Sequence, residues 1–274
     1  MLRVVIVVGT LAAIAVGATL ALGGSAVDKH GARVVRFTVH SRYVHQPLPV
    51  VAVVPAGASA GPRPLLVFLH GKGEDQNSNL GDSMFAALAR LGPNAPDVVF
   101  PYGGDDSYWH DRADGAWGRY VMNEVIRQAV LRLGADPHRV AIGGISMGGF
   151  GAFNLARLDP GRFCAVGGHS PALWVSGGES AAGAFDDAED FARNDVIGAA
   201  RARDPYRGMS VWIDVGTDDP FRVADTDLAV ALRRHGQPVA FHVWPGSHTG
   251  SYWSSHWDSY LRFYAGALGR CRSG

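Results

Sequence analysis

The feature that most constrains this chain is the five-residue run Gly144-Ile145-Ser146-Met147-Gly148. It follows a predicted apolar strand at residues 139–142 and precedes a predicted helix at 151–158. A serine in such a strand–turn–helix unit is held in a strained conformation, with its hydroxyl exposed at the edge of a sheet. The flanking glycines remove side chains that would clash where strand and helix approach closely. The pattern therefore predicts a nucleophilic Ser146, and a structural serine in a glycine-rich turn is the alternative.

Predicted strands and helices alternate along the rest of the chain. An antiparallel hairpin is expected from residues 33–40 and 49–54, and the apolar run at 65–69 is typical of a buried parallel strand. Further strands are predicted at residues 97–100, 139–142, 163–167, 211–215 and 239–244. Helices are predicted at residues 79–91, 119–133, 151–158, 223–235 and 252–268. This alternation indicates an α/β domain with a mostly parallel central sheet and helices on both faces.

Two segments depart from the alternation. Residues 103–118 form a polar, aromatic loop that is too long to be a simple connection. Residues 171–205 are rich in Ala, Asp and Glu and lack strand character, so a helical insertion over the carboxyl-terminal edge of the sheet is expected. The acidic cluster at residues 186–190 is expected to be a solvated helix face rather than a metal site.

Length and charge narrow the class of protein. The 274 residues suffice for one large α/β domain, and no repeat or domain break divides residues 33–268. Because 25 Lys and Arg balance 25 Asp and Glu, no net charge attracts the chain to nucleic acid. A hydrophobic content of 47% argues against global disorder.

The N-terminal segment predicts export. Residues 1–26 combine one early arginine, an uncharged apolar stretch and small residues at 23–26, which is typical of a secretory signal peptide. An uncleaved anchor is the alternative, since about 20 apolar residues span a bilayer; it would associate the protein with the membrane or cell envelope. Cys164 and Cys271 are the only cysteines. In an exported protein they could form a disulfide, and a buried Cys164 with a free Cys271 is the alternative.

A nucleophilic serine needs an imidazole base and a carboxylate that orients the imidazole. With this type of serine turn, the chain order is serine, acid, histidine. His248 lies in the loop 245–250 that leaves the last predicted strand, so it can reach over the carboxyl-terminal edge of the sheet. A surface loop histidine is the alternative interpretation of His248. The turn 216–221 supplies two candidate acids, Asp218 and Asp219, whereas Asp214 lies within a strand.

Backbone amides are expected to stabilise a developing oxyanion. The N–H of Met147 lies at the start of a helix, and that of Lys72 lies in the loop after the strand at 65–69. Serine, imidazole and amides suffice for the chemistry, so no cofactor and no metal are expected. Substrate contacts are expected from Trp109, His169 and Trp253, and loop stabilisation is the alternative for Trp109 and His169.

Four motifs together resemble one family. Residues 69–72, 144–149, 216–221 and 246–253 are similar to those of the esterase family of the α/β-hydrolases, in the branch of esterase D, S-formylglutathione hydrolase and the mycobacterial mycolyltransferases. The resemblance spans residues 33–268 and implies the α/β-hydrolase fold. It also implies Ser146 as nucleophile, His248 as base, an acid within 216–221, and an oxyanion hole of Met147 and Lys72.

The choice between the two aspartates follows from this resemblance. In the esterase D-like pattern Gly-x-Asp-Asp-x-Phe the second aspartate is catalytic, which corresponds to Asp219. Pro220 also restricts its predecessor to an extended conformation, which favours a fixed orientation of Asp219. Asp218 is expected to stabilise the turn by accepting local backbone N–H bonds.

These observations predict an exported serine carboxylesterase that acts on a small-molecule or lipid ester through a Ser146–His248–Asp219 triad and an acyl-enzyme. One alternative is a mycolyltransferase-like acyltransferase that moves lipid acyl groups to a sugar, with Trp109, Trp253 and the insertion forming an acceptor site. The acid in the resembled mycolyltransferases is typically glutamate, which favours the esterase. A second alternative is a non-catalytic surface binding protein on a hydrolase fold.

Overall fold

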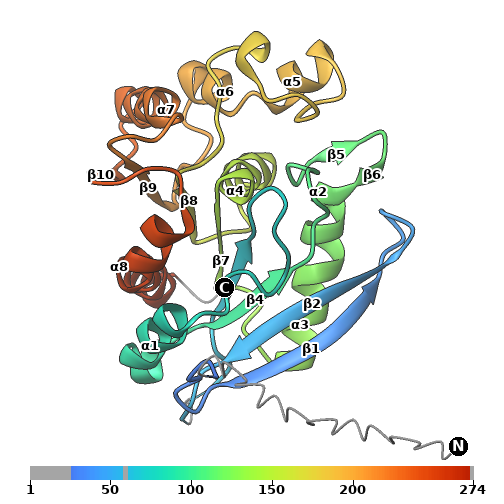
Figure 1. The fold of residues 1–274 in the computed structure, drawn as a ribbon, viewed down its shortest axis with the longest axis vertical. Coiled ribbons are helices and arrows are strands. Elements are labelled where there is room, and N and C mark those ends of the chain that lie inside the picture. Colours follow the sequence, from blue (N-terminus) through green and yellow to red (C-terminus); the bar gives the residue numbers. More distant parts are fainter. Residues whose placement is uncertain (1–25, 58–60, 272–274) are drawn as a thin grey trace, which may run out of the picture.

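The computed structural model describes residues 26–57 and 61–271 (Figure 1). Apart from Ala26, the predicted signal segment lies outside the described residues. None of the helices within the described ranges is long and apolar enough to cross a membrane.

A central sheet of eight strands runs in the order β1-β2-β4-β3-β7-β8-β9-β10 (Figure 1). The strands are β1 (Arg33–His40), β2 (Pro47–Val54), β3 (Leu65–Leu69), β4 (Asp97–Pro101), β7 (Val140–Ile145), β8 (Ala165–His169), β9 (Ser210–Gly216) and β10 (Val239–Trp244). The pairs β1–β2 and β2–β4 are antiparallel, and all other neighbours are parallel. The carboxyl ends of the parallel strands therefore share one edge, where ligands bind in open α/β sheets.

Helices cover both faces of the sheet, because successive side chains of a strand point to opposite faces. Leu65, Val67 and Leu69 of β3 join the core that contains the helices of one face, whereas Leu66 and Phe68 join the core on the other. The first face carries α2 (Trp117–Tyr120), α3 (Ile126–Leu133), α4 (Met147–Leu158) and α7 (Arg222–Arg234). The second carries α1 (Asp82–Arg90) and α8 (Gly250–Arg270). The predicted fold class is confirmed.

Some predicted elements differ in detail. The helix expected at residues 119–133 contains a π-helical segment, η2 (Val121–Val125), between α2 and α3. A short 3₁₀ turn, η1 (Gly92–Asn94), follows α1. The long loop at residues 103–118 contains a small hairpin, β5 (Asp111–Arg112) and β6 (Gly115–Ala116).

The insertion is helical mainly in its second half, with η3 (Gly177–Glu179), α5 (Ala188–Asn194) and α6 (Val196–Ala202). The prediction that its acidic cluster is a solvated helix face was wrong for Asp190, which is 1% exposed. Its carboxylate lies 2.9 Å from His110 Nε2, and Asp186 pairs with Arg112 at 3.2 Å. These carboxylates attach the insertion to the long loop, which sequence spacing did not indicate.

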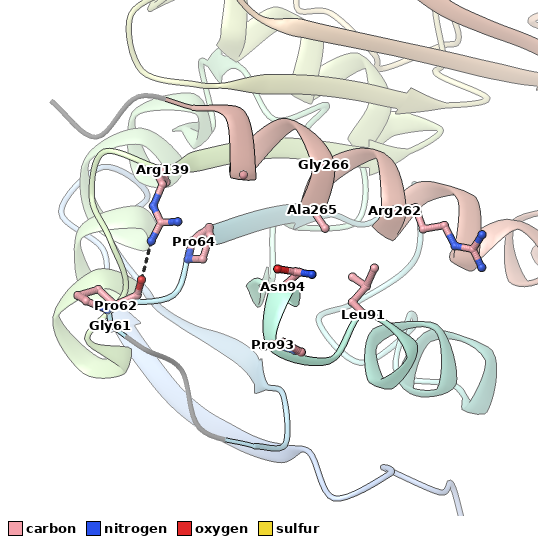
Figure 2. A pocket seen from close by; sticks show the side chains of 11 residues that line it. Gly61, Pro62, Pro64, Leu91, Pro93, Asn94, Arg139, Arg262, Ala265 and Gly266 are labelled. Atoms are coloured by element: carbon pink, nitrogen blue, oxygen red, sulfur yellow. Dashed lines mark hydrogen bonds between the residues drawn. The ribbon is translucent and has the colours of Figure 1, made fainter.

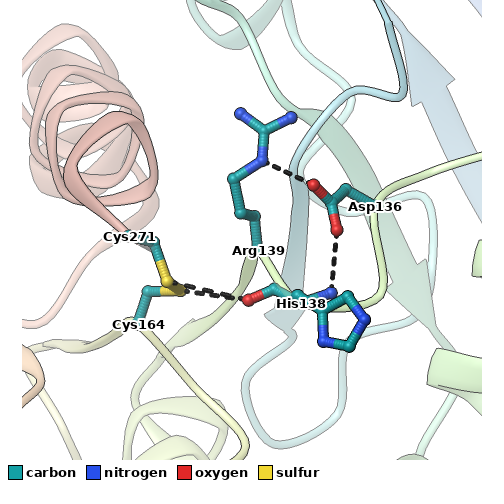
Figure 3. Close-up of a disulfide and its surroundings, with 5 residues drawn as sticks. All are labelled: Asp136, His138, Arg139, Cys164 and Cys271. Atoms are coloured by element: carbon teal, nitrogen blue, oxygen red, sulfur yellow. Dashed lines mark hydrogen bonds and ion pairs between the residues drawn. A yellow bond between two sulfur atoms is a disulfide. The ribbon is translucent and has the colours of Figure 1, made fainter. Parts of the chain in front are cut away.

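The two cysteines are paired in the fold. Cys164, directly before β8, and Cys271, directly after α8, form a disulfide with their Cα atoms 5.7 Å apart (Figure 3). The bond ties the end of the last helix to the sheet. Of the two alternatives left open by the sequence, the paired form is the one observed.

Candidate active site

The serine turn connects β7 to α4 and has the geometry expected of a nucleophile. Ser146 adopts φ 53° and ψ −116°, a positive φ that a non-glycine residue rarely takes. A Cβ at Gly148 would overlap the backbone of Leu69, and one at Gly144 would overlap Gly148. The two glycines are therefore required by the close approach of strand and helix, and they leave the Ser146 side chain partly exposed.

Three predicted residues form a hydrogen-bonded chain at the carboxyl-terminal edge of the sheet. His248 Nε2 lies 2.8 Å from Ser146 Oγ, and His248 Nδ1 lies 2.9 Å from Asp219 Oδ2. Strands β7, β9 and β10 supply the three residues from the loops at their ends. The Asp219 side chain is 0% exposed, whereas that of His248 is 23% exposed. A buried acid, an intermediate imidazole and an accessible hydroxyl suit proton transfer from serine to histidine.

The two adjacent aspartates, Asp218 and Asp219, differ in burial and in hydrogen-bond partners. Asp219 Oδ1 accepts a hydrogen bond from the Phe221 N–H at 2.9 Å, which leaves Oδ2 for His248. Asp218 is exposed, and its carboxylate contacts only the Thr217 hydroxyl, at 3.3 Å. The expectation that Asp218 accepts local backbone N–H bonds was wrong, because Asp219 takes that bond as well as the one from His248.

One predicted oxyanion donor, Met147, directly follows the serine, and the loop that carries the other, Lys72, passes close to it. Met147 is the first residue of α4, where helix N–H groups have no intrahelical partner. Gly71 precedes Lys72 and lies so close to Ser146 that a Cβ added to it would be 3.6 Å from the Ser146 Cβ. Among the described residues, the Lys72 N–H has no hydrogen-bond acceptor. The Lys72 side chain itself is exposed to solvent.

Two residues fix the loop that carries Lys72. His70 Nδ1 lies 2.8 Å from the Gly71 carbonyl, and its Nε2 accepts the Gly103 N–H at 3.0 Å. Burial lowers the pKa of His70, which keeps the ring neutral and lets it serve both as donor and as acceptor. Glu74, which sequence reasoning missed, accepts the Gly71 N–H at 2.8 Å. Its spacing of three residues from Gly71 is that of a local turn, the one signal available in the sequence.

Two of the predicted substrate contacts are not at the site. Trp109 is 0% exposed and donates its Nε1–H to the His70 carbonyl at 3.1 Å, so it supports the loop instead. His169 is also 0% exposed, with Nδ1 2.6 Å from Asp214 and Nε2 3.0 Å from the Tyr264 hydroxyl. The predictions that Trp109 and His169 contact the substrate were therefore wrong, because fully enclosed side chains cannot touch a ligand. Trp253 does lie at the site, with its ring 4.9 Å from that of His248.

Asp214 is the centre of a buried polar network behind the serine. Besides His169, its carboxylate accepts hydrogen bonds from Trp212 Nε1 at 2.7 Å and from the hydroxyls of Tyr252 and Tyr260 at 3.0 Å each. The His169 carbonyl accepts the Ser146 N–H at 3.1 Å. The network therefore connects the serine turn to helix α8, which begins directly after the His248 loop.

One large hollow of the surface lies away from the triad. It has a volume of about 650 Å³ and is lined by Pro62 and Pro64, by Leu91 and Asn94, and by Arg262 of α8 (Figure 2). Arg139 donates to the Pro62 carbonyl at its rim, at 2.7 Å. None of the triad residues lines this hollow, so volume alone does not identify the site.

Fold and serine site together define an α/β-hydrolase. A family profile described as "Putative esterase" matches residues 41–264, and the chain belongs to that family. The S-formylglutathione hydrolase of Paracoccus denitrificans (strain Pd 1222) is 26% identical over 251 residues, which cover 81% of this chain and 89% of the relative. The resemblance predicted from the four motifs is confirmed.

Solved structures of esterases share the fold. A ferulic acid esterase superposes with a TM-score of 0.75 at 22% identity, covering 86% of this chain and 99% of its own. An S-formylglutathione hydrolase from Agrobacterium tumefaciens superposes with a TM-score of 0.73 at 20% identity, covering 87% and 96%. Membership of the family supports a hydrolase of the esterase class, and these neighbours share its fold.

Proposed function

We propose that this chain is an exported serine carboxylesterase that hydrolyses a small-molecule or lipid ester. The single observation that carries the proposal is the hydrogen-bonded chain from Ser146 through His248 to the enclosed Asp219, on a strained turn. Membership of an esterase family supports the reaction class. Export rests on the apolar segment at residues 1–26 alone.

The proposed reaction begins with attack of Ser146 Oγ on the ester carbonyl carbon, while His248 Nε2 takes the hydroxyl proton. The negative charge that forms on the carbonyl oxygen is stabilised by the N–H groups of Met147 and Lys72. When the intermediate collapses, the bond to the alcohol oxygen breaks, and His248 returns its proton to that oxygen. The alcohol leaves, and the acyl group stays on Ser146.

Water completes the cycle. His248 removes a proton from the attacking water, and the resulting hydroxide oxygen bonds to the acyl carbon. The acyl–oxygen bond to Ser146 then breaks while His248 returns the proton to Ser146 Oγ, and the acid is released. Throughout, the Asp219 carboxylate orients the ring through Nδ1 and stabilises the positive imidazolium. No co-reactant other than water is consumed.

Hydrolysis of a short-chain nitrophenyl ester tests the proposal. The purified mature protein should release nitrophenol, and Ser146→Ala should lower kcat on the order of 10⁴-fold. Ser254→Ala, an exposed serine of α8, is the matched control and should leave the rate unchanged. Equal rates for wild-type and Ser146→Ala would refute the assignment.

The export part of the proposal has its own test. Cell fractionation and N-terminal sequencing should recover a mature chain that begins near residue 24 or 27 outside the cytoplasm. Full-length protein in the cytosol would contradict export without affecting the catalytic proposal.

A further inference from the structure

Three aromatic side chains extend from the triad in a continuous row that we call the aromatic wall: Phe221, Trp174 and Phe185. The ring of Phe221 lies 5.1 Å from that of His248, and the Trp174 ring lies 5.9 Å from that of Phe221. Phe185 follows, 5.8 Å from Trp174. The row therefore begins in contact with the imidazole that must meet a bound ester.

The aromatic wall is presented to solvent, unlike the rings behind it. Trp174, Phe185 and Phe221 are all half-buried, whereas Phe150 and Tyr108 are only 2% and 3% exposed. Trp174 rests against both of these enclosed rings, at 5.6 Å from Tyr108 and 6.3 Å from Phe150. The wall thus has an exposed surface and a rigid base.

Hydrogen bonds of the backbone attach the aromatic wall to the residues of the triad. The Ala172 N–H donates to the Ser146 carbonyl at 2.9 Å, two residues before Trp174. On the other side, the Phe221 N–H is bound by the catalytic-acid candidate Asp219. Phe221 and the segment that carries Trp174 are therefore attached to residues of the triad, and Phe185 packs on Trp174. A ring bound on Phe221 and Trp174 would sit at a fixed distance from Ser146.

We propose that the aromatic wall selects esters that carry an aryl group, a substrate class that rests on the proposed esterase function. Rings pack best on other rings in edge-to-face or offset arrangements, which alkyl groups cannot reproduce. The contacts Phe221–Trp174 and Trp174–Phe185 are themselves edge-to-face, at 81° and 78°, and each of the three residues keeps part of its surface exposed. The Trp174 indole N–H has no acceptor among the described residues, so it can bind a substituent oxygen on that ring.

The test compares matched substrates whose ester chemistry is the same. 2-Phenylethyl acetate and butyl acetate differ by a ring on the alcohol side, and methyl 3-phenylpropanoate and methyl butanoate by a ring on the acyl side. The wild-type kcat/KM should favour the aryl member of at least one pair by about tenfold. The pair that shows the preference identifies the side on which the ring binds.

Variants of the aromatic wall test whether it causes the preference for aryl esters. Trp174→Leu and Phe185→Leu should each bring the aryl-to-alkyl ratio of that pair close to one, with circular dichroism confirming a folded chain. Phe241→Leu, a half-buried phenylalanine on β10 outside the wall, is the matched control and should keep the wild-type ratio.

Two outcomes would overturn the inference. One is a wild-type ratio near one in both pairs, and the other is a Trp174→Leu variant that lowers aryl and alkyl rates equally. Either result leaves ester hydrolysis intact. Failure of the proposed function differs from both, because then none of the four esters would be hydrolysed in a Ser146-dependent manner.

Discussion

Asp219 and His248 are joined by a hydrogen bond of 2.9 Å, and the carboxylate that accepts it has no solvent-exposed surface. Such a carboxylate can lower the energy of an imidazolium only if it stays charged and correctly aimed. The Phe221 N–H supplies the second fixed contact that aims it.

Asp219→Asn should lower kcat by about 10⁴-fold, because the amide carries no charge and favours the wrong histidine tautomer. Asp218→Asn is the adjacent control. Since Asp218 is exposed and contacts only Thr217, we expect wild-type kcat and a change within about 0.5 kcal/mol in the free energy of unfolding. Steady-state kinetics of both folded variants measure this, and the reverse ranking would identify Asp218 as the acid.

Tyr252→Phe should reduce kcat, because Tyr252 anchors the first turn of α8, directly after the His248 loop, to Asp214. Tyr260→Phe is the matched control: it removes an equally long bond to the same carboxylate oxygen, two turns further along the helix. Each variant should lose about 1.5–3 kcal/mol of stability, the usual worth of a hydrogen bond to a charged group. We expect a clear fall in kcat only for Tyr252→Phe; equal kcat values would show that the network is purely structural.

Asp225→Asn should stabilise the protein at neutral pH. Asp225 lies in the first turn of α7, is fully buried, and neither carboxyl oxygen has a hydrogen-bond partner among the described residues. Burial, with repulsion from Asp219 and Asp214, raises its pKa well above the ordinary 3.8.

The sign of the Asp225 effect follows from linkage. Because the folded state holds the proton more tightly, stability is lost as the pH rises above 3.8, where the unfolded chain ionises. The Asn variant avoids this loss. Its Tm should exceed that of the wild type at pH 7, and the difference should shrink as the pH falls from 7 towards 4 and level off below that. A constant difference at all pH values would contradict a protonated Asp225.

Replacing both Cys164 and Cys271 by Ala should lower stability by about 4 kcal/mol. The disulfide closes a loop with a sequence separation of 107, and long loops lose most entropy in the unfolded chain when they are closed. Denaturant unfolding of the oxidised wild type, the reduced wild type and the double variant measures the effect. The last two should coincide, and equal stability of all three would show that the bond contributes nothing.

Local patterns predicted most of the fold. The strand at 239–244 and the first strand at 33–40 begin and end where predicted, because alternation and β-branched residues act over a few neighbours. The π-helical segment η2 carries no comparable signal, since its residues are compatible with an ordinary helix. The loop order after the parallel strands also predicted Ser146, His248 and an acid of the turn 216–221 side by side, whereas the choice of Asp219 over Asp218 rested on the family resemblance and on Pro220.

Burial at the sheet edge could not be predicted in the same way. His169 and Trp109 have residue types suited to binding a ligand. In the fold, however, they bind groups that are distant in sequence: His169 contacts the Tyr264 hydroxyl, and Trp109 contacts the His70 carbonyl. Conversely, Trp174 and Phe221 resemble ordinary core residues in the sequence. Their exposure depends on how the insertion lies against the sheet, which no local pattern encodes.

The most direct measurement is mass spectrometry of the protein after reaction with a fluorophosphonate probe. Such probes form a stable bond with a serine that an adjacent histidine activates. We expect one probe per chain, on the peptide that contains Ser146, and no labelling of His248→Ala. Labelling of another residue, or none in the folded wild type, would contradict Ser146 as the nucleophile.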